Sequence, residues 1–347
     1  MDSLTQIALG SAVGVAVMGR RTAVWKAALW GAVAGTLPDL DAFIDHGDAI
    51  QNMTRHRAES HAIFVLTLFA PVMAWIVSRI HGEAALFKRW WLALWLVLIT
   101  HPLLDAMTVY GTQLLQPFSD YPFGVGSMFI IDPLYTVPLI VGVVAALALK
   151  SVRGLKWNVV GLVLSTLYLG WSVVAQQQAT QLARASLQAE GITPEGLLVT
   201  PAPFNTVLWR LVATTPTHYM EAHHSLLDRN ARIEWSVHDR GPALIERYRQ
   251  DPNVAKMAAF THGFYSVSQR EDHLYLTDLR MGQEPSYTFR FDLGTDAARA
   301  NGGHLPTREA SRPDIGTALP WLWRRIRGEQ LPSPLVPAAT PRFTSPK

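Results

Sequence analysis

The feature that most constrains this fold is a series of long apolar stretches in the first half of the chain. From Leu4 to about Ala175 only short polar loops interrupt them, whereas from Gln176 onward charge and proline increase and apolar runs shorten. A membrane-spanning helix needs roughly 20 mostly apolar residues, with about 17 as the lower limit. The stretches of this length are His61–Ile80, Trp90–His101 with its flanks, Asp132–Leu149 and Trp157–Ala175. We therefore predict a helical membrane bundle followed by a soluble domain.

Two earlier stretches, Leu4–Met18 and Ala23–Leu37, are shorter and rich in small residues. Their glycines are Gly10, Gly14, Gly31 and Gly35. Small residues at such spacing allow helix backbones to approach closely inside a membrane bundle. One buried hairpin of a soluble protein would show the same pattern, but four longer stretches follow it. We therefore count both and predict about six spans.

The charges of the loops predict the orientation of the bundle. Alternate loops are basic: they hold Arg20 and Arg21, then Arg79, Lys88 and Arg89, then Lys150, Arg153 and Lys156. The intervening loops, 38–60 and 104–131, are acidic or nearly uncharged apart from Arg55 and Arg57. Because basic loops stay in the cytoplasm, we expect a multi-pass protein of the bacterial inner (cytoplasmic) membrane with its C-terminal domain outside. In a Gram-negative cell, that is the periplasm.

Composition excludes several classes of function. The net charge is only +3 and no basic stripe with interleaved aromatic residues is present, so we expect the lipid bilayer rather than nucleic acid as the partner. The absence of cysteine excludes disulfides, thiolate nucleophiles and cysteine-bound metal. The start Met1-Asp2-Ser3 lacks a basic region, and no A-x-A site follows the first apolar run, which argues against a cleavable signal peptide.

Ionisable side chains gather near the ends of the predicted spans. They are Asp2, Asp39, Asp41, His56, His61, His101, Asp105 and Asp132. Such groups are costly near a membrane and are therefore candidates for function. The topology predicted from lysine and arginine places all of them at the outer edge of the bundle. The two lines of reasoning use different residues and agree.

The spacing of these residues suggests how they meet. His101 and Asp105 are four residues apart, so on a helix they share one face and can bind one ion. Pro102 between them is tolerated if His101 ends the span or a new turn begins there. Asp39 and Asp41 share one side if the segment after Pro38 is extended.

Histidines and carboxylates together point to metal binding. His56 and His61 are five residues apart, so we place one on the loop and the other on the helix. Neutral imidazoles with carboxylates form a ligand set for Zn²⁺, or for Mn²⁺ or Fe²⁺, and there are enough of them for two ions. Each residue also has a plainer role: Asp132 before Pro133 would cap a helix, and Arg55 and Arg57 would bind lipid headgroups. Their convergence on one edge favours the metal site.

Four segments resemble one family, the bacterial YdjM-like inner-membrane proteins, which are described as metal-dependent hydrolases. The segments are Met1-Asp2-Ser3-Leu4-Thr5-Gln6, Leu37-Pro38-Asp39-Leu40-Asp41, His56-Arg57-Ala58-Glu59-Ser60-His61 and His101-Pro102-Leu103-Leu104-Asp105. The resemblance covers roughly the first half of the chain. It implies a metal site made of Asp39, Asp41, His56, His61, His101 and Asp105, with Asp2 near them. Gln6 departs from a histidine in the family pattern, so the site has one ligand fewer or Gln6 coordinates through its amide oxygen.

The hydrolase mechanism we expect uses a metal-bound water as the nucleophile. A divalent ion lowers the pKa of that water from about 15.7 to about 7. Asp41 or Glu59 would act as the general base, and Arg57 or Arg55 would hold a phosphate, since a guanidinium pairs with it bidentately. A site at the outer membrane face suits an amphiphilic or lipid-linked ester or phosphoester.

Two other classes of function remain open on the sequence. One is a non-enzymatic inner-membrane scaffold or envelope-stress protein in which a structural metal fastens the loops. The other is a transporter with an ion pathway. The transporter is disfavoured because charges are few within the predicted spans.

We divide the chain into a transmembrane domain (1–176), an extracytoplasmic soluble domain (177–331) and a disordered tail (332–347) rich in proline, serine and threonine. Residues Gln176–Glu190 contain no helix breaker and should continue the last span as a helix. Runs with alternating or β-branched residues predict the strands of an antiparallel β-rich α+β domain: Leu197–Thr200, Thr206–Thr214, Arg232–Val237, His273–Leu279 and Ser286–Phe291. Its histidines, including His223 and His224, are typical of exposed histidines in a soluble domain, with a second metal site as the alternative.

Overall fold

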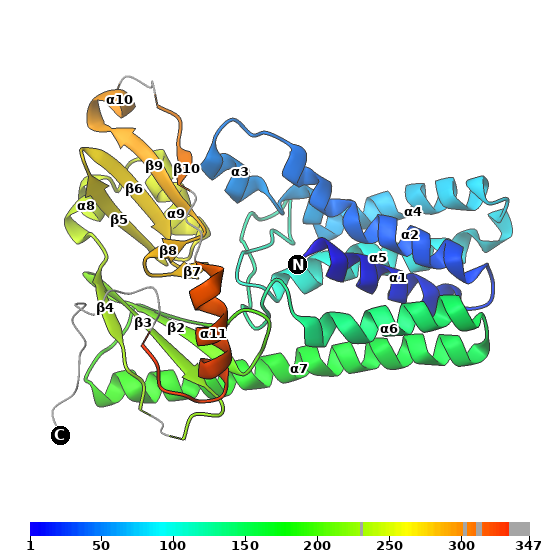
Figure 1. Ribbon diagram of the computed structural model, residues 1–347. Helices are drawn as coiled ribbons and strands as arrows, with labels where there is room; N and C mark the ends of the chain where they lie inside the picture. The colour runs from blue at the N-terminus through cyan, green and yellow to red at the C-terminus, as the bar shows by residue number, and fades with distance from the viewer. Residues whose placement is uncertain (230–231, 301–303, 310–313, 333–347) are drawn as a thin grey trace. The chain divides into compact units, whose positions relative to one another are not determined.

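The computed structural model describes residues 1–229, 232–300, 304–309 and 314–332 (Figure 1). The chain forms two units, and the changeover falls within one long helix. The first unit holds Met1–Ile44, Arg55–Val173 and Pro203–Asn205, and the second holds Asp45–Thr54, Val174–Ala202 and the chain from Thr206 onward. A helical N-terminal region is thus followed by a β-rich C-terminal region, as the sequence predicted.

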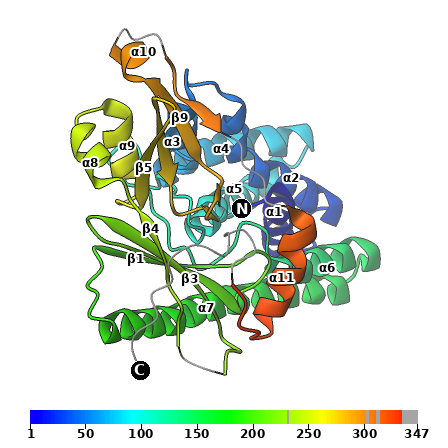
Figure 2. The same ribbon diagram turned by 60° about the vertical axis from the view of Figure 1, so that its left-hand side comes forward.

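The first unit is built from α-helices that run side by side (Figures 1 and 2). They are α1 (Ser3–Met18), α2 (Val24–Thr36), α4 (Ile63–Ile80), α5 (Phe87–Ala106), α6 (Pro133–Leu149) and the first part of α7 (Val152–Ala189). Three 3₁₀ turns, η1 (Pro38–Phe43), η2 (Glu59–His61) and η3 (Ala84–Leu86), lie in the connections. Each of the six predicted apolar stretches is therefore helical. Helix α5 continues through Pro102 to Ala106 rather than ending at His101.

The helices of this unit differ in whether they are long and apolar enough to cross a membrane. Among the described residues, α4 and α7 are long and apolar enough to cross a membrane, while α1 and α6 are apolar but shorter. Helix α5 has the length, but it carries Lys88 and Arg89 in its first turn and Asp105 in its last. Six spans are thus not confirmed. Large apolar side chains are exposed along α4, α6 and α7: Leu68, Val72, Trp75, Leu134, Val137, Val141, Val144, Val160, Val163, Leu164 and Leu167. Such a surface is unfavourable in water and suits lipid.

Close packing of α1 on α2 confirms what their small residues predicted. A Cβ built on Gly10 would lie 2.2 Å from the carbonyl oxygen of Gly31, and one built on Gly31 would lie 2.2 Å from that of Gly10. Only glycine permits this approach of two helix backbones. The apolar core of this unit includes Val15, Trp90 and Leu98, which are buried.

The second unit contains two antiparallel sheets and a hairpin. The first sheet has the order β1 (Gly196–Pro201), β2 (Leu208–Thr214), β3 (His218–Ser225), β4 (Ser236–Asp239). The second has the order β10 (Thr307–Glu309), β9 (Arg290–Thr295), β6 (His273–Asp278), β5 (Tyr265–Arg270), and β7 (Gly282–Gln283) pairs with β8 (Ser286–Tyr287). The helices are α8 (Pro242–Arg247), α9 (Pro252–Phe260), α10 (Asp296–Ala300), α11 (Ile315–Ile326) and most of α3 (Ala49–Arg55).

The last part of α7 covers the first sheet (Figure 2). Its alanines Ala175, Ala179 and Ala183 recur every four residues and pack with Trp209 of β2 in a common core. This spacing places one helix face against the sheet. The prediction that the last apolar helix continues out of the bundle is confirmed, because α7 runs unbroken to Ala189.

The strand predictions were partly right. The runs that we expected at 197–200, 206–214 and 273–279 are β1, β2 and β6, but 286–291 is divided between β8 and β9 and most of 232–237 is not a strand. Strands β3 and β5 were missed. Strand β3 does not alternate, because residues on both of its faces are buried, including the charged Glu221, which pairs with Arg210 of β2. The predicted tail lies outside the described residues except for Pro332.

Candidate metal centre

Helix ends bring four of the predicted ligands together. Asp39 lies on η1 just after α2, His61 ends η2 just before α4, and His101 and Asp105 lie in the last turns of α5. Gln6 near the start of α1 donates to Asp105 Oδ1 at 3.0 Å. Because successive helices alternate in direction, these ends all lie at the same end of the helical unit. The prediction that His101 and Asp105 share one helix face is confirmed.

The four side chains converge on one point. Nε2 of His61 lies 3.1 Å from Nε2 of His101 and 3.4 Å from both Asp39 Oδ1 and Asp105 Oδ2. Nε2 of His101 lies 3.5 Å from Asp39 Oδ1 and 3.7 Å from Asp105 Oδ2, and all four atoms lie within 4.8 Å of one another. For a tetrahedral ion with bonds of about 2.0–2.2 Å, neighbouring ligand atoms are about 3.3 Å apart. The cluster therefore has the dimensions of a site that could hold one metal ion.

Hydrogen bonds outside the cluster fix the direction of both imidazoles. His101 Nδ1 lies 2.7 Å from the carbonyl oxygen of Gly35, so it donates there and a neutral ring presents the lone pair of Nε2 to the cluster. Ser60 Oγ donates to Asp41 Oδ2 at 2.5 Å, so His61 Nδ1, 2.9 Å from Ser60 Oγ, is the donor in that contact. When both rings are neutral, the four converging atoms are then all acceptors, with no donor among them. Four acceptor atoms at this distance repel one another unless a cation lies between them.

The pKa values of the site agree with this charge balance. Burial lowers the pKa of His61, but the neighbouring carboxylates of Asp105, Asp39 and Asp41, which favour the protonated ring, outweigh burial and raise it to about 9. Burial raises the pKa of Asp39, but the imidazoles of His101 and His61 beside it hold it below the ordinary value. Without a metal, the cluster therefore takes up a proton on His61. A bound metal replaces that proton, so metal affinity should weaken as pH falls.

Asp105 has one satisfied oxygen and one unsatisfied oxygen. Besides Gln6, the α-amino group of Met1 donates to Oδ1. Oδ2 is buried without a hydrogen bond among the described residues, although Arg57 Nε lies 3.1 Å away, because that ion pair lacks hydrogen-bond geometry. The guanidinium of Arg57 also donates to Thr108 Oγ1 at 3.2 Å and lies over the Tyr110 ring. The unsatisfied oxygen is the one that faces His61 and His101.

Asp41 lies one layer outside this cluster. Its Oδ1 is 2.8 Å from His56 Nδ1, and its Oδ2 accepts from the backbone N–H of Arg57 at 2.9 Å and from Ser60. The expectation that Asp39 and Asp41 lie on an extended piece was wrong. Pro38 begins a 3₁₀ turn, which directs Asp39 toward the two histidine Nε2 atoms and Asp41 toward His56.

The other candidates have separate positions. Asp2 caps α1 by accepting from the backbone N–H of Thr5, and Asp132 caps α6 by accepting from that of Leu134 at 3.0 Å, which confirms the plainer reading of Asp132. Glu59 is exposed and Gln6 is buried. Within the described part of the chain, nothing hydrogen-bonds the carboxylate of Glu59 or the amide oxygen of Gln6.

Sequence reasoning missed three groups that orient the site. Ser60 links Asp41 to His61, the carbonyl of Gly35 orients His101, and Thr108 binds Arg57. The role of Ser60 could have been predicted from its position beside His61. The role of Gly35 could not have been predicted, because a backbone carbonyl leaves no signal in the side-chain pattern.

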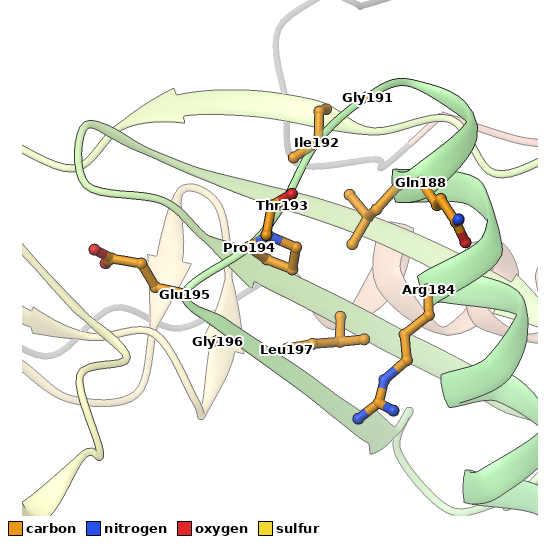
Figure 3. A pocket seen from close by; sticks show the side chains of 10 residues that line it. Arg184, Gln188, Gly191, Ile192, Thr193, Pro194, Glu195, Gly196 and Leu197 are labelled. Carbon is orange, nitrogen blue, oxygen red and sulfur yellow. The ribbon is translucent and has the colours of Figure 1, made fainter.

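A cavity of about 610 Å³ lies in the second unit, between the end of α7 and the chain leading into β1 (Figure 3). Arg184 and Gln188 line it from the helix and Thr193 and Glu195 from the loop. Glu195 points away from Arg184 in this view and pairs with Arg240 at 2.9 Å. Arg184, Gln188 and Glu195 are exposed and do not converge, so the cavity lacks the arrangement seen around His61.

The helical unit and its buried histidine–aspartate cluster define a membrane-associated protein with a site that could bind a metal ion. Comparison with known families gives a more specific result: residues 1–179 match the YdjM inner membrane protein family, and the chain belongs to that family. It is also similar to the "Uncharacterized protein YfhP" of Bacillus subtilis (strain 168), with 24% identity over 303 residues that cover 83% of this chain and 89% of that protein. No solved structure matches.

Proposed function

We propose that this protein is a metal-dependent hydrolase of an ester or phosphoester carried by an amphiphilic molecule. The observation that supports it best is the convergence of four acceptor atoms, from Asp39, His61, His101 and Asp105, with no donor among them. Zn²⁺, Mn²⁺ and Fe²⁺ all accept imidazole and carboxylate ligands.

The residues around the cluster supply what hydrolysis requires. A divalent ion held there would lower the pKa of a water molecule and polarise the scissile group. Glu59, exposed and without a hydrogen-bonding partner in the described structure, is the base best able to take the proton of that water. Arg57, whose buried Nε donates no hydrogen bond, has a guanidinium that would stabilise a phosphate. Asp41 is the less suitable base because both its oxygens are already engaged.

The membrane context suggests the kind of substrate. The basic loops argue for an outward-facing site, and the ligands come from helix ends rather than helix centres. A substrate with a polar ester headgroup and apolar tails would meet both the cluster and the bilayer. Outward orientation, six spans and an extracytoplasmic C-terminal domain together form part of this proposal.

A second candidate is a scaffold protein with a structural metal. It is favoured by the ligand count, because structural zinc sites have four protein ligands whereas catalytic ones keep a position open. One observation argues against a closed site: the side chain of Asp39 remains 21% exposed, whereas that of His61 is fully buried, so the cluster can be reached from the side of Asp39. A metal with more than four ligands would also leave room for a substrate.

The test begins with the metal content of the purified full-length protein, measured by elemental mass spectrometry. The variant His101→Ala/Asp105→Ala should lose the metal. The matched control His273→Ala/Asp292→Ala removes another histidine–aspartate pair, 2.8 Å apart in the second unit, and should retain it. A wild type that holds no metal even after reconstitution would refute the proposal.

Replacement of the metal by Co²⁺ separates the two candidates. If the site is open, added phosphate binds the ion and changes its visible absorption spectrum. Hydrolysis is then assayed with p-nitrophenyl phosphate, bis(p-nitrophenyl) phosphate and p-nitrophenyl butyrate. If phosphate does not change the absorption spectrum and none of the three probes is hydrolysed, the scaffold with a structural metal is the supported function.

A further inference from the structure

Asp41 and His56 form a hydrogen-bonded pair beside the cluster, and neither residue is among the four candidate metal ligands. Nδ1 of His56 lies 2.8 Å from Oδ1 of Asp41, and Asp41 Oδ2 is held by the backbone N–H of Arg57 at 2.9 Å and by Ser60 at 2.5 Å. The carboxylate is thus fixed at both oxygens. A carboxylate fixed in this way sets the orientation and tautomer of its histidine, so His56 carries its hydrogen on Nδ1 and presents Nε2.

The ring of His56 lies next to the cluster without joining it. Its centroid is 6.0 Å from that of His61 and 5.5 Å from that of Tyr110, and both pairs are edge-to-face. The four atoms that lie within 4.8 Å of one another do not include an atom of His56. Among the described residues, no hydrogen-bond partner is present for its Nε2.

Exposure distinguishes His56 from the two clustered histidines. The side chain of His56 retains 24% of its exposure, whereas those of His61 and His101 retain 0% and 1%. Asp41 behind it is buried. A histidine that is anchored on its buried side and open on the other can reach a bound molecule, and it can exchange protons with water.

We propose that His56 remains outside the coordination shell of the metal, takes up a second proton on Nε2 from solvent, and donates that proton to the leaving-group oxygen of the substrate, with Asp41 as its positioning residue. This inference rests on the proposed hydrolase function and names a further catalytic residue for it. It also separates His56 from the ligands that the family resemblance implied.

The step balances as an ordinary hydrolysis. The oxygen of a water molecule forms a bond to phosphorus, and the bond between phosphorus and the leaving-group oxygen breaks. The bonding electron pair leaves with that oxygen, which takes the proton from His56 Nε2. The attacking water loses one proton to Glu59, and His56 regains its proton from solvent. No oxidant or further reactant is consumed.

The first test concerns the position of His56 and does not depend on activity. His56→Gln should hold as much metal as the wild type, whereas His61→Gln should lose it. In the metal-loaded protein, diethyl pyrocarbonate should modify His56 as fast as in the metal-free protein. Peptides must be produced by cleavage at glutamate, because cleavage at arginine would release His56 in a dipeptide with Arg57. Metal loss in His56→Gln, or protection of His56 by metal, would make it a ligand and overturn the inference.

The second test concerns the proton. General acid catalysis contributes about 10²–10⁴-fold, and it matters most when the leaving group is a strong base. Turnover of phenyl phosphate by His56→Gln should fall about 100-fold or more with KM little changed, whereas turnover of p-nitrophenyl phosphate, whose leaving group needs no proton, should fall less than about 10-fold. Asp41→Asn should show the same selectivity to a smaller degree.

The outcomes separate this inference from the function on which it rests. If the metal-loaded wild type hydrolyses neither phosphate probe, phosphoester hydrolysis is refuted and the proton donor with it. If the wild type is active and His56→Gln loses nothing, or loses the same factor on both probes, the inference alone is refuted. A structural role for His56 predicts equal losses on the two probes.

Discussion

The contact between α1 and α2 allows a quantitative test of how the metal centre is supported. In Gly31→Ala the new Cβ would lie 2.2 Å from the carbonyl oxygen and 2.7 Å from the carbonyl carbon of Gly10, and 2.9 Å from Cα of Ser11. Ordinary contacts begin at about 3.4 Å, so the helices must separate by about 1 Å. All three neighbours are backbone atoms, which cannot turn aside as a side chain can.

The separation should be measurable as a loss of stability. Overpacking of this kind costs about 1–3 kcal/mol, and for a unit of about 150–250 residues each kcal/mol lowers Tm by about 2–4 °C. Gly31→Ala in detergent should therefore melt about 2–12 °C below the wild type at the same scan rate. The matched control is Gly170→Ala on α7, where a Cβ meets nothing within 4 Å. It should melt at the wild-type temperature or slightly above, since alanine also restricts the unfolded chain.

The same substitution should weaken metal binding, although Gly31 touches none of the candidate ligands. Helix α2 carries Gly35, whose carbonyl accepts from His101 Nδ1 at 2.7 Å, and leads directly into Asp39. A shift of about 1 Å breaks this hydrogen bond, and loss of such an orienting partner costs about 10–100-fold in metal affinity. Affinity is measured by competition with a chromogenic chelator. If Gly31→Ala matches Gly170→Ala in both Tm and metal affinity, the argument that helix packing positions the site is wrong.

Three further perturbations test other parts of the molecule. Ser60→Ala removes the group that links Asp41 to His61, so the same chelator competition should show metal affinity lower by about 10–100-fold, and an unchanged affinity would contradict that role. Burial raises the pKa of Glu83, but hydrogen bonds from Lys26, Thr22 and Trp90 outweigh it and lower the pKa below the ordinary 4.5. The ionised carboxylate of Glu83 therefore stabilises the folded protein above that pH, and this stabilisation is lost as pH falls below it. Tm should drop more steeply on acidification for the wild type than for Glu83→Gln. Parallel curves of Tm against pH for the two proteins would refute this. Arg325→Met leaves the buried carboxylate of Asp228 without its bidentate partner and should cost about 3–5 kcal/mol, detected as faster proteolysis around α11, whereas unchanged proteolysis would count against the pair.

The sequence was most informative where structure is decided locally. Apolar stretches predicted all six helices of the first unit because a long run without breakers has few alternatives to a helix. The glycines of α1 and α2 predicted their close contact because no other residue permits it. The spacing of His101 and Asp105 predicted their common face because helical periodicity fixes it.

The sequence was least informative where a few backbone angles decide the outcome. Asp39 and Asp41 are nearly adjacent, yet one faces the cluster and the other faces His56, because the segment is a 3₁₀ turn. Arg57 adopts φ 66°, a left-handed conformation that is rare for arginine and that directs its N–H toward Asp41. Composition and spacing cannot predict such a conformation. Strand β3 was missed for a related reason, since the burial of Glu221 depends on Arg210 of another strand.

The two ends of the helical unit show why one end is the functional candidate. At the end away from the cluster, Glu83 accepts from Thr22 and Lys26 at 2.7 Å and from Trp90 at 2.9 Å, and His81 Nε2 accepts from Trp30. Each of these acceptors has a hydrogen-bond donor, so the polar side chains at that end hold the helices together without a further ligand. At the other end, Asp105 Oδ2 is buried without a hydrogen bond in the described structure, and it converges with atoms of Asp39, His61 and His101 that could hold a metal ion. A fold retains such an imbalance where function requires it, and a cation is what would complete this end.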